Sequence, residues 1–258
     1  MHSIKDNNDM DDIKMTTQPR YIIQAGTTAA PETIYIQVTK DGPYLVHGSP
    51  KLLQVFIEKN ESGNSGRYRE GKTFETQDKM YLCRCGHSKN APFCDGSHLK
   101  AGEDLTEAEN FAPLLEGSSE IDGPVQILTD NENYCAFSRF CDNGNRVWSE
   151  VQMSGKEHEQ LTEFMVHNCA GGRLLVWDKK TLQPIEMAED AGIYPIEDPG
   201  IGCSGPLMVR GGVRVESADG RSYEIRNRQA LCRCGKSSNK PFCNGAHASV
   251  KYQDGIEE

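Results

Sequence analysis

The sequence predicts an α+β protein, in which two small β-rich modules flank a segment of mixed helix and strand. Three observations indicate this class. A stretch of the first half, YLCRCGHSKNAPFCDGSH (81–98), aligns without gaps on ALCRCGKSSNKPFCNGAH (230–247), with identity at 12 of 18 positions. Apolar residues alternate with polar ones before each copy, as they do in half-buried strands. Between the copies, the apolar residues change to helical spacing.

The hydrophobic content of the 258 residues is modest, at 36%. This favours several small modules over one large core, and bound metal commonly stabilises small modules. We expect the two repeats to pack as an internal pseudo-dimer. The chain divides into a disordered tail, a first module, an acidic connector, a middle domain and a second module, at 1–20, 21–100, 101–122, 123–190 and 191–258.

The formal charge of −10 and the pI of about 5.3 argue against a nucleic-acid-binding surface and suit a protein that meets other proteins. No apolar run approaches the roughly 20 residues of a transmembrane helix. Residues 1–20 lack the apolar core of a secretory signal, so we expect a cytoplasmic protein. In a reducing cytosol the ten cysteines would be free thiols and candidate metal ligands rather than disulfides.

In the first module, Ile34, Ile36 and Val38 alternate with polar residues and predict a strand. The following GPYLVHG (42–48) matches GPLMVRG of the second module. The polar stretch KNESGNSGRYREG (59–71) has the composition of a flexible loop.

In the second module, Val213 and Val215 predict another strand. Asp219-Gly220 then predicts a hairpin turn. The acidic run at 99–123 is most simply a solvated face that includes a short helix.

The middle region has the predicted order strand, loop, strand, helix, strand. The strands are predicted at 125–129, around VWSEV (147–151) and at RLLVWD (173–178). Ser154 and Glu157 resemble a capping box for the helix. Leu161, Phe164 and Met165 lie at helical spacing, and we expect the Phe and Met side chains to belong to the core.

The repeated motif has the residue types of a metal site. The first copy supplies three cysteines and a histidine, and the second repeats them at identical spacing: Cys83, Cys85, Cys94 and His98, then Cys232, Cys234, Cys243 and His247. Thiolates and imidazole bind both iron–sulfur clusters and zinc. Four such ligands also suit tetrahedral zinc, and spacing alone leaves both metals open.

Other residues of the motif fit a tight loop around a cofactor. Pro92 and Pro241 restrict the backbone, and Gly96 and Gly245 allow a close approach. Asp95 and Asn244 are good N-cap residues for a helix that carries the histidine. The hydroxyls of Ser88 and Ser237 are candidate donors to a cluster sulfur or a thiolate.

CRCGHSKNAPFCDGSH resembles the CDGSH iron–sulfur domain, whose pattern is C-x-C-x2-S-x3-P-x-C-D-G-S-H. The first copy matches throughout, and the second departs at Asn244 and Ala246. The resemblance implies a 2Fe-2S cluster at each copy, with Cys83 and Cys85 on one iron and Cys94 and His98 on the other. The departures keep every ligand, but they leave open the potential and the lability of the second cluster.

The histidine ligand has consequences for such clusters. A bound imidazole detaches when it is protonated, and replacement of thiolate by imidazole raises the reduction potential, as in Rieske centres. We therefore expect the visible spectrum to change between about pH 8 and pH 5.5. We also expect His98→Cys to give a more acid-stable cluster.

Three further cysteines lie in the middle region: Cys135, Cys141 and Cys169. Their Cys-x5-Cys…Cys pattern resembles divergent single-cluster ferredoxins, which implies a ferredoxin-like insert and a third cluster of 3Fe-4S or 4Fe-4S type. Ser138 stands where full ferredoxins have a middle cysteine, so an insert that has lost its cluster would leave the same pattern. Cys203, His47, His158 and His167 are not grouped and are expected to be bystanders.

The arrangement as a whole resembles bacterial tandem CDGSH proteins with a divergent ferredoxin domain. The resemblance implies electron transfer or redox sensing with protein partners. The alternatives are transfer of clusters or iron to an acceptor protein, and a structural zinc module. No Cys–His–acid constellation points to an enzyme, and the sequence leaves the oligomeric state open.

Overall fold

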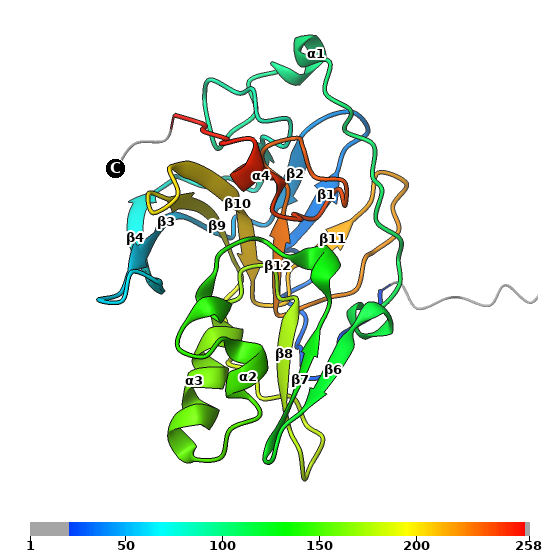
Figure 1. Cartoon of the computed structure of the whole chain (residues 1–258). Helices are drawn as coiled ribbons and strands as arrows, with labels where there is room; N and C mark the ends of the chain where they lie inside the picture. The colour runs from blue at the N-terminus through cyan, green and yellow to red at the C-terminus, as the bar shows by residue number, and fades with distance from the viewer. Residues whose placement is uncertain (1–20, 256–258) are drawn as a thin grey trace, which may run out of the picture.

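The computed structural model describes residues 21–255 (Figure 1). The protein is a mixed α and β structure with many strands and few, short helices, which is compatible with the predicted α+β class. The predicted tail at 1–20 lies outside the described residues. No helix within 21–255 has the length and the apolar character that crossing a membrane requires.

Two sheets carry the repeats. The first has the order β11-β1-β2-β5, formed by Arg214–Glu216, Tyr35–Val38, Tyr44–His47 and Lys79–Leu82. The second has the order β12-β10-β9-β3-β4, formed by Arg228–Leu231, Cys203–Arg210, Gly192–Asp198, Lys51–Lys59 and Ser65–Thr73. The predicted strands at 34–38 and around Val215 are confirmed. The hairpin turn is also confirmed, since the amide of Ser217 donates to the carbonyl of Arg221 at 2.8 Å.

Each sheet contains strands from both repeats: the first takes β11 from the second repeat, and the second takes β3 and its hairpin partner β4 from the first. β11 lies parallel to β1, with Tyr35 opposite Arg214, and β3 lies parallel to β9, with Lys51 opposite Gly192. The remaining pairs match in register. Tyr44 of β2 faces Leu82 of β5, as Leu207 of β10 faces Leu231 of β12. The two halves of the fold therefore exchange equivalent strands.

One hydrophobic core lies between these sheets and contains residues of both repeats, such as Ile36, Val46, Leu207 and Leu231. Tyr44 crosses between the halves. It is 1% exposed, and its hydroxyl lies 2.8 Å from the carbonyl oxygen of Cys232. Folding of one repeat thus depends on side chains from the other.

The flexible loop predicted at 59–71 is wrong over most of its length. Residues 65–73 form β4, which pairs with β3 as a hairpin. The side chain of Asn60 closes the turn by accepting hydrogen bonds from two backbone amides. The sequence of β4 is polar because β4 is an edge strand. Its side chains nevertheless pack on the neighbouring strand: the guanidinium of Arg69 lies 4.4 Å from the ring centroid of Phe56 in β3. Polar composition indicated exposure correctly and disorder incorrectly.

The middle region and the end of the connector together form a third sheet of three antiparallel strands, β6-β7-β8, at Ser119–Asp122, Gln126–Asp130 and Leu174–Asp178. The strands predicted at 125–129 and 173–178 are confirmed. The helices are α2 and α3, at Val147–Glu150 and Lys156–His167, and the remaining short helices are η1 (Leu114–Gly117), η2 (Glu132–Tyr134), η3 (Phe140–Asp142), α1 (His98–Ala101) and α4 (Ala246–Ser249). Figure 1 shows α2 and α3 beside this sheet, below the two larger ones.

The strand predicted around 147–151 is wrong, because VWSEV forms α2. Val147 and Val151 are both buried, four residues apart, which is helical spacing. The predicted capping box is also wrong. Gly155 precedes α3, and no side chain caps this helix. Met165 lies in the core as expected, whereas Phe164 remains 37% exposed.

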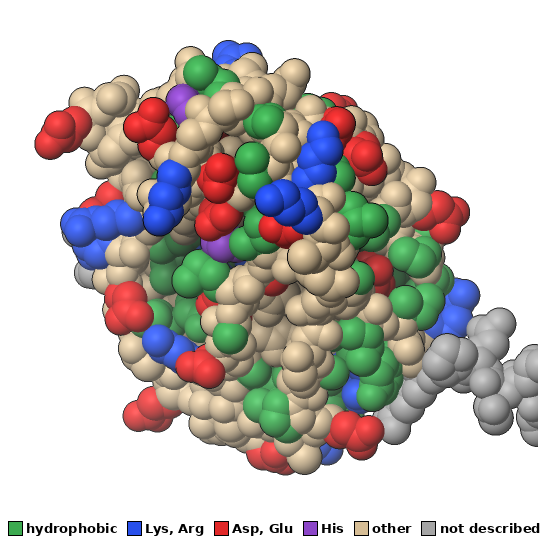
Figure 2. Space-filling model, turned by 90° about the horizontal axis from the view of Figure 1, so that it is seen from below, with side chains coloured by type: hydrophobic (Ala, Val, Ile, Leu, Met, Phe, Trp, Pro, Cys, Tyr) green, Lys and Arg blue, Asp and Glu red, His purple; other side chains and the backbone are tan. Residues whose placement is uncertain are grey.

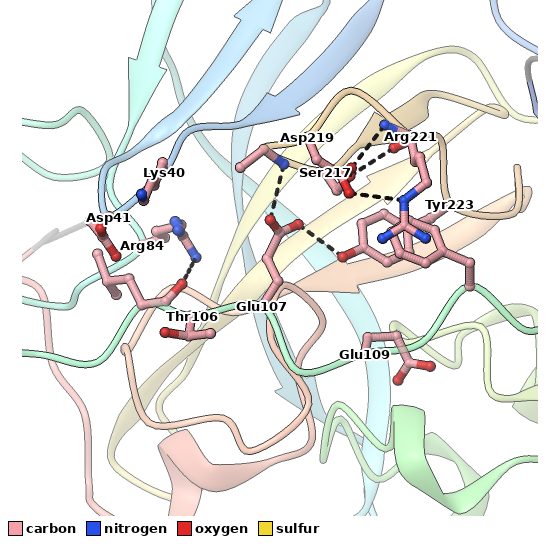
Figure 3. A pocket seen from close by; sticks show the side chains of 13 residues that line it. Lys40, Asp41, Arg84, Thr106, Glu107, Glu109, Ser217, Asp219, Arg221 and Tyr223 are labelled. Carbon is pink, nitrogen blue, oxygen red and sulfur yellow. Dashed lines mark hydrogen bonds and ion pairs between the residues drawn. The ribbon is translucent and has the colours of Figure 1, made fainter.

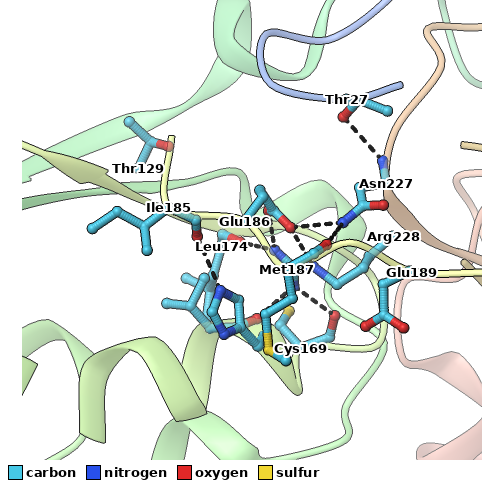
Figure 4. A network of polar contacts seen from close by, with 12 residues as sticks. Thr27, Thr129, Cys169, Leu174, Ile185, Glu186, Met187, Glu189, Asn227 and Arg228 are labelled. Carbon is cyan, nitrogen blue, oxygen red and sulfur yellow. Dashed lines mark hydrogen bonds and ion pairs between the residues drawn. The ribbon is translucent and has the colours of Figure 1, made fainter. Parts of the chain in front are cut away.

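The middle region is tied to the second repeat through Arg228 of β12 (Figure 4). This arginine is 3% exposed and donates to the carbonyls of Cys169 and Leu174, both at 3.2 Å. It also pairs with Glu186 at 2.6 Å. The cation thus satisfies backbone carbonyls at the ends of α3 and of the following turn.

The connector does not present a purely solvated face. Glu107 accepts hydrogen bonds from the hydroxyl of Tyr223 at 2.8 Å and from the amide of Ala218 at 3.0 Å. Phe111 stacks on Tyr223, with ring centroids 4.5 Å apart. Figure 3 shows Glu107, Tyr223 and Arg84 around a cavity, whose volume is about 340 Å³ and which Phe111 and Ala218 also line. The connector therefore packs over the first sheet.

Acidic and basic side chains are interspersed over the face that Figure 2 shows, with hydrophobic side chains between them. This face carries no concentrated basic field of the kind that a phosphate backbone attracts.

Candidate metal centres

The first motif begins where β5 ends. The amide of Cys83 donates to the carbonyl of Pro92, and the amide of Cys94 donates to that of Tyr81, both at 2.8 Å. These bonds fold the loop back on the strand. They bring the four predicted ligands into two pairs. The Sγ atoms of Cys83 and Cys85 are 3.7 Å apart, and Cys94 Sγ lies 3.4 Å from Nδ1 of His98.

The second motif follows β12 in the same way. The amides of Cys232 and Cys243 donate to Pro241 and Ala230 at 2.8 Å. The Sγ atoms of Cys232 and Cys234 are 3.8 Å apart, and Cys243 Sγ lies 3.5 Å from Nδ1 of His247. Identical spacing in sequence has become nearly identical geometry.

These separations suit two ligands that share one metal ion. Two thiolates bound tetrahedrally at about 2.3 Å lie roughly 3.8 Å apart, and a thiolate and an imidazole lie roughly 3.5 Å apart. Each of the four pairs therefore has the spacing of two ligands on one metal ion. Between residues 21 and 255, no three side chains of His, Cys, Asp or Glu converge on a single ion position.

Each Cys-x-Cys pair shares a proton. A hydrogen bond from Cys85 lowers the pKa of Cys83 to about 5, and the amides of Ser88 and Gly86 assist. The pKa of Cys85 is raised by its hydrogen bond to Cys83 and by burial. The second site repeats this pattern, because a hydrogen bond from Cys234 lowers the pKa of Cys232 to about 6. A bound cation would replace the shared proton.

The supporting residues act on the loop backbone. The hydroxyls of Ser88 and Ser237 donate to the carbonyls of Phe93 and Phe242 at 2.6 and 2.7 Å, rather than to a thiol. The Ser88 contact to Cys83 comes instead from the amide.

Asp95 and Asn244 do not occupy the N-cap positions expected of them. The helices begin at His98 and Ala246, directly after Ser97 and Gly245. The side chains still satisfy amides where the helices start, since Asp95 accepts from Ser97, just before α1, at 2.9 Å, and Asn244 accepts from Ala246, the first residue of α4, at 3.2 Å.

Sequence reasoning missed the contact between the two sites. The backbones of Cys85 and Cys234 form an isolated antiparallel bridge. Gly86 and Gly235 both have positive φ, at 80° and 74°. A Cβ on Gly86 would lie 2.7 Å from the carbonyl oxygen of Cys234, and one on Gly235 would lie 2.6 Å from that of Cys85. Only glycine fits either position.

Sequence reasoning also missed the role of the arginine that stands between the two cysteines of each Cys-x-Cys pair. Arg84 and Arg233 are buried, and their Nε atoms donate to equivalent carbonyls, of Gly42 at 2.6 Å and Gly205 at 2.9 Å. The other donors of Arg84 reach the carbonyls of Leu105 and Thr39.

Arg233 has carboxylate partners as well. It pairs with Glu197 at 2.9 Å and with Asp254. The identical C-R-C triplet was the available signal for these arginines, but the partners of Arg233 come from distant strands and from the C-terminal segment.

The three middle cysteines lie in one region, where Cys169 and Cys135 are both neighbours of Cys141. Burial and the neighbouring Cys169 and Asp142 raise the pKa of Cys141 to about 12. Cys135 is hydrogen-bonded to Arg173, whose guanidinium also holds Asp130.

The remaining candidates have ordinary structural contacts. His158 pairs with Glu150, His167 bonds the carbonyl of Ile185, and His47 stacks on Tyr35.

Comparisons with known proteins agree with these observations. A family model described as an iron-binding zinc finger of CDGSH type matches residues 41–99 and 204–248. The chain is 30% identical over 82 residues to CDGSH iron-sulfur domain-containing protein 1 of Rattus norvegicus, which covers 32% of this chain and 54% of the rat protein. The match thus spans about half the length of that relative.

Two further relatives show the same likeness. Identity is 34% over 96 residues to CDGSH iron-sulfur domain-containing protein 2 homolog A of Branchiostoma floridae, covering 35% and 63% of the two chains. It is 30% over 101 residues to the Bos taurus CDGSH iron-sulfur domain-containing protein 1, covering 36% and 79%. No solved structure matches at a comparable significance. With two copies of the motif, this chain belongs to the CDGSH iron–sulfur domain family.

Proposed function

We propose that the chain holds two 2Fe-2S clusters, each through three cysteines and one histidine, and serves in electron transfer or redox sensing. The observation that carries the proposal is the pairing of ligands within each site, at 3.7 and 3.4 Å in the first and 3.8 and 3.5 Å in the second. Each pair supplies half of a tetrahedral sphere, and the bridging sulfides of a 2Fe-2S cluster would supply the other half. We propose a carrier rather than an enzyme.

Structural zinc is the competing reading of the same ligands. A single zinc ion needs four ligands around one point. Within each site, the candidate ligands form one Cys–Cys pair and one Cys–His pair. This arrangement supports two iron ions for each site.

We further propose that the repeats form an internal pseudo-dimer. The exchange of β3 and β11 between the sheets, the matched registers and the reciprocal contacts of Gly86 and Gly235 support it. A ferredoxin-like origin for 123–190 stays a prediction, as does a cytoplasmic location. A third cluster at Cys135, Cys141 and Cys169 also stays a prediction, and the contact between Cys135 and Arg173 gives it no support.

A second candidate function is transfer of a cluster to an acceptor protein. The half-buried state of Cys94 and His98 favours it, since an acceptor thiolate must reach the iron. Reversible reduction without cluster loss would favour the electron carrier. Transfer to an apo-ferredoxin would favour the donor.

Iron and sulfide analysis of the purified chain tests the main proposal. We expect a red-brown protein with about four iron and about four sulfide per chain, two of each per cluster. Cys94→Ser should remove about half of each, whereas the control Cys203→Ser should remove none. About seven iron would admit a third cluster, and a colourless protein that carries only zinc would overturn the proposal.

A further inference from the structure

The two sites differ in how well their Cys–His sides are covered. Cys94 and His98 are half-buried, whereas Cys243 and His247 are each only 3% exposed. Since the loops are nearly identical in geometry, the difference comes from what lies on them.

The other side of each site is covered equally. Leu105 packs on Cys83 and Cys85 and is 4% exposed. Tyr252 packs on Cys232 and Cys234 and is 8% exposed. The asymmetry is therefore confined to the side that carries the histidine.

The middle region covers the second site. A Cβ built on Gly245, two residues before His247, would lie 3.1 Å from the carbonyl oxygen of Cys135 and 3.3 Å from Cβ of Phe137. A Cβ on the equivalent Gly96 would meet nothing within 4 Å, although both glycines have φ near +83°, at 83° and 84°.

Two further contacts fix this cover in place. Nδ2 of Asn239, in the second motif, donates to the carbonyl of Asn133 at 3.0 Å. The ring of Tyr134 meets that of Phe242 edge-on, with centroids 5.4 Å apart. The segment from Asn133 to Phe137 thus packs against the second motif loop through both hydrogen bonds and ring contacts.

We propose that the two sites are unequal. The first is the exchange site, where a thiol-bearing acceptor or a chelator reaches the iron, and the second retains its cluster under the cover of residues 133–137. This inference rests on the proposed function and deepens it. It gives the middle region a role that needs no cluster of its own.

Exchange at the first site is a ligand substitution without electron transfer. Bonds from iron to Cys83, Cys85, Cys94 and His98 break, and bonds to four acceptor thiolates form. The four acceptor thiols lose four protons, three of which the released cysteines take up, while the neutral imidazole takes none and one proton enters solvent.

Cluster release from the oxidised full holoprotein to excess EDTA at pH 8, followed as the loss of visible absorbance, tests the proposal. We expect two phases of equal amplitude. Cys94→Ser should abolish the fast phase, and Cys243→Ser should abolish the slow one. If Cys243→Ser does not fold, Phe137→Gly and its control Leu182→Gly still test the proposal.

Phe137→Gly should uncover the second site. The side chain is 42% exposed and its φ is +54°, so glycine relieves backbone strain and the fold should persist. We expect the slow phase to accelerate about tenfold, the factor that corresponds to a 1.4 kcal/mol lower barrier. The fast phase should stay unchanged. Leu182→Gly is the matched control, because this residue is also exposed, with φ +55° in the same region, and lines a different cavity.

A single release rate for both clusters, or a slow phase that Phe137→Gly does not alter, would overturn the inference. Iron and sulfide are assayed before the kinetics. Failure of the proposed function would appear there, as a chain without two clusters.

Discussion

At the scale of single residues, the contrast between Arg84 and Arg233 separates two sites with the same ligands. The hydrogen bonds of Arg84 go to three backbone carbonyls, whereas Arg233 also pairs with two acidic side chains. A cluster becomes more negative by one charge when it is reduced, so nearby carboxylates oppose reduction. The identity of the triplet C-R-C did not reveal this, because the acidic partners are distant in sequence.

Asp254→Asn should therefore raise the reduction potential of the second cluster and leave that of the first unchanged. The carboxylate is 1% exposed, so solvent screens it little. Potentiometric titration followed by EPR measures both values. Asp142→Asn, at a carboxylate 47% exposed in its pair with Arg146, is the control. A potential that falls or stays constant in Asp254→Asn would contradict the argument.

The paired glycines give a second prediction at this scale. Gly86→Ala should lower the free energy of unfolding by about 2–4 kcal/mol, because its Cβ would meet a backbone carbonyl at 2.7 Å in a left-handed conformation. Gly235→Ala should behave alike. Gly220 has φ +86°, and a Cβ built on it would meet nothing within 4 Å. Gly220→Ala should therefore lower the free energy of unfolding less, by the cost of the left-handed backbone alone. Chemical denaturation compares the three, and equal losses would argue against the contact between the loops.

At the scale of elements, sequence patterns predicted what is local. Alternation located β1, β7 and β8, and helical spacing located α3, because these periods depend on neighbours within one element. β4 and α2 were missed. The polar residues of β4 suited a loop as well as an edge strand. The short VWSEV is rich in β-branched and aromatic residues, which favours a strand, although its two valines lie four residues apart. The exchange of β3 and β11 depends on non-local pairing that no local period encodes.

The attachment of the middle region to β12 has a predicted pH dependence. Burial alone would raise the pKa of Glu186, but the charge and the hydrogen bond of Arg228 outweigh it and leave that pKa lowered. A depressed carboxylate pKa contributes stability above its unfolded value, here 4.5, and loses it as the pH falls through the folded value.

Glu186→Gln should accordingly be less stable than the wild type at pH 7, by about 1–3 kcal/mol. The difference in the free energy of unfolding between the two proteins should become smaller below about pH 4.5. Urea denaturation of both proteins at each pH checks this, since effects common to both proteins cancel in the difference. A gap that widens in acid would show that Glu186 is not the responsible carboxylate.

At the scale of the whole molecule, the repeat and its eight candidate ligand residues were visible in the sequence, because residue identity and spacing are one-dimensional. The sequence also led us to expect an internal pseudo-dimer, but it did not reveal that strands are exchanged between the repeats. The expectation of two modules at 21–100 and 191–258 treats each module as a unit, whereas each of the two larger sheets contains strands from both modules.

The fragment 1–118 expressed alone should therefore neither remain a soluble monomer nor retain a cluster. β3 contains the buried run Leu52–Ile57 and would lose β9, its parallel neighbour. Coexpression with 119–258 should restore both properties. Size-exclusion chromatography with iron analysis reports the result. A monomeric fragment with a stable cluster would mean that the halves are independent domains.

The backbone bridge between Cys85 and Cys234 has a consequence for the count of electrons. It places the backbone of a proposed ligand of one cluster beside the backbone of a proposed ligand of the other, in the interior of the fold. A partner that docks only at the open end would thus reach both one-electron centres. The chain would then store two electrons that enter and leave through the first cluster alone, and the covered second cluster would hold one of them.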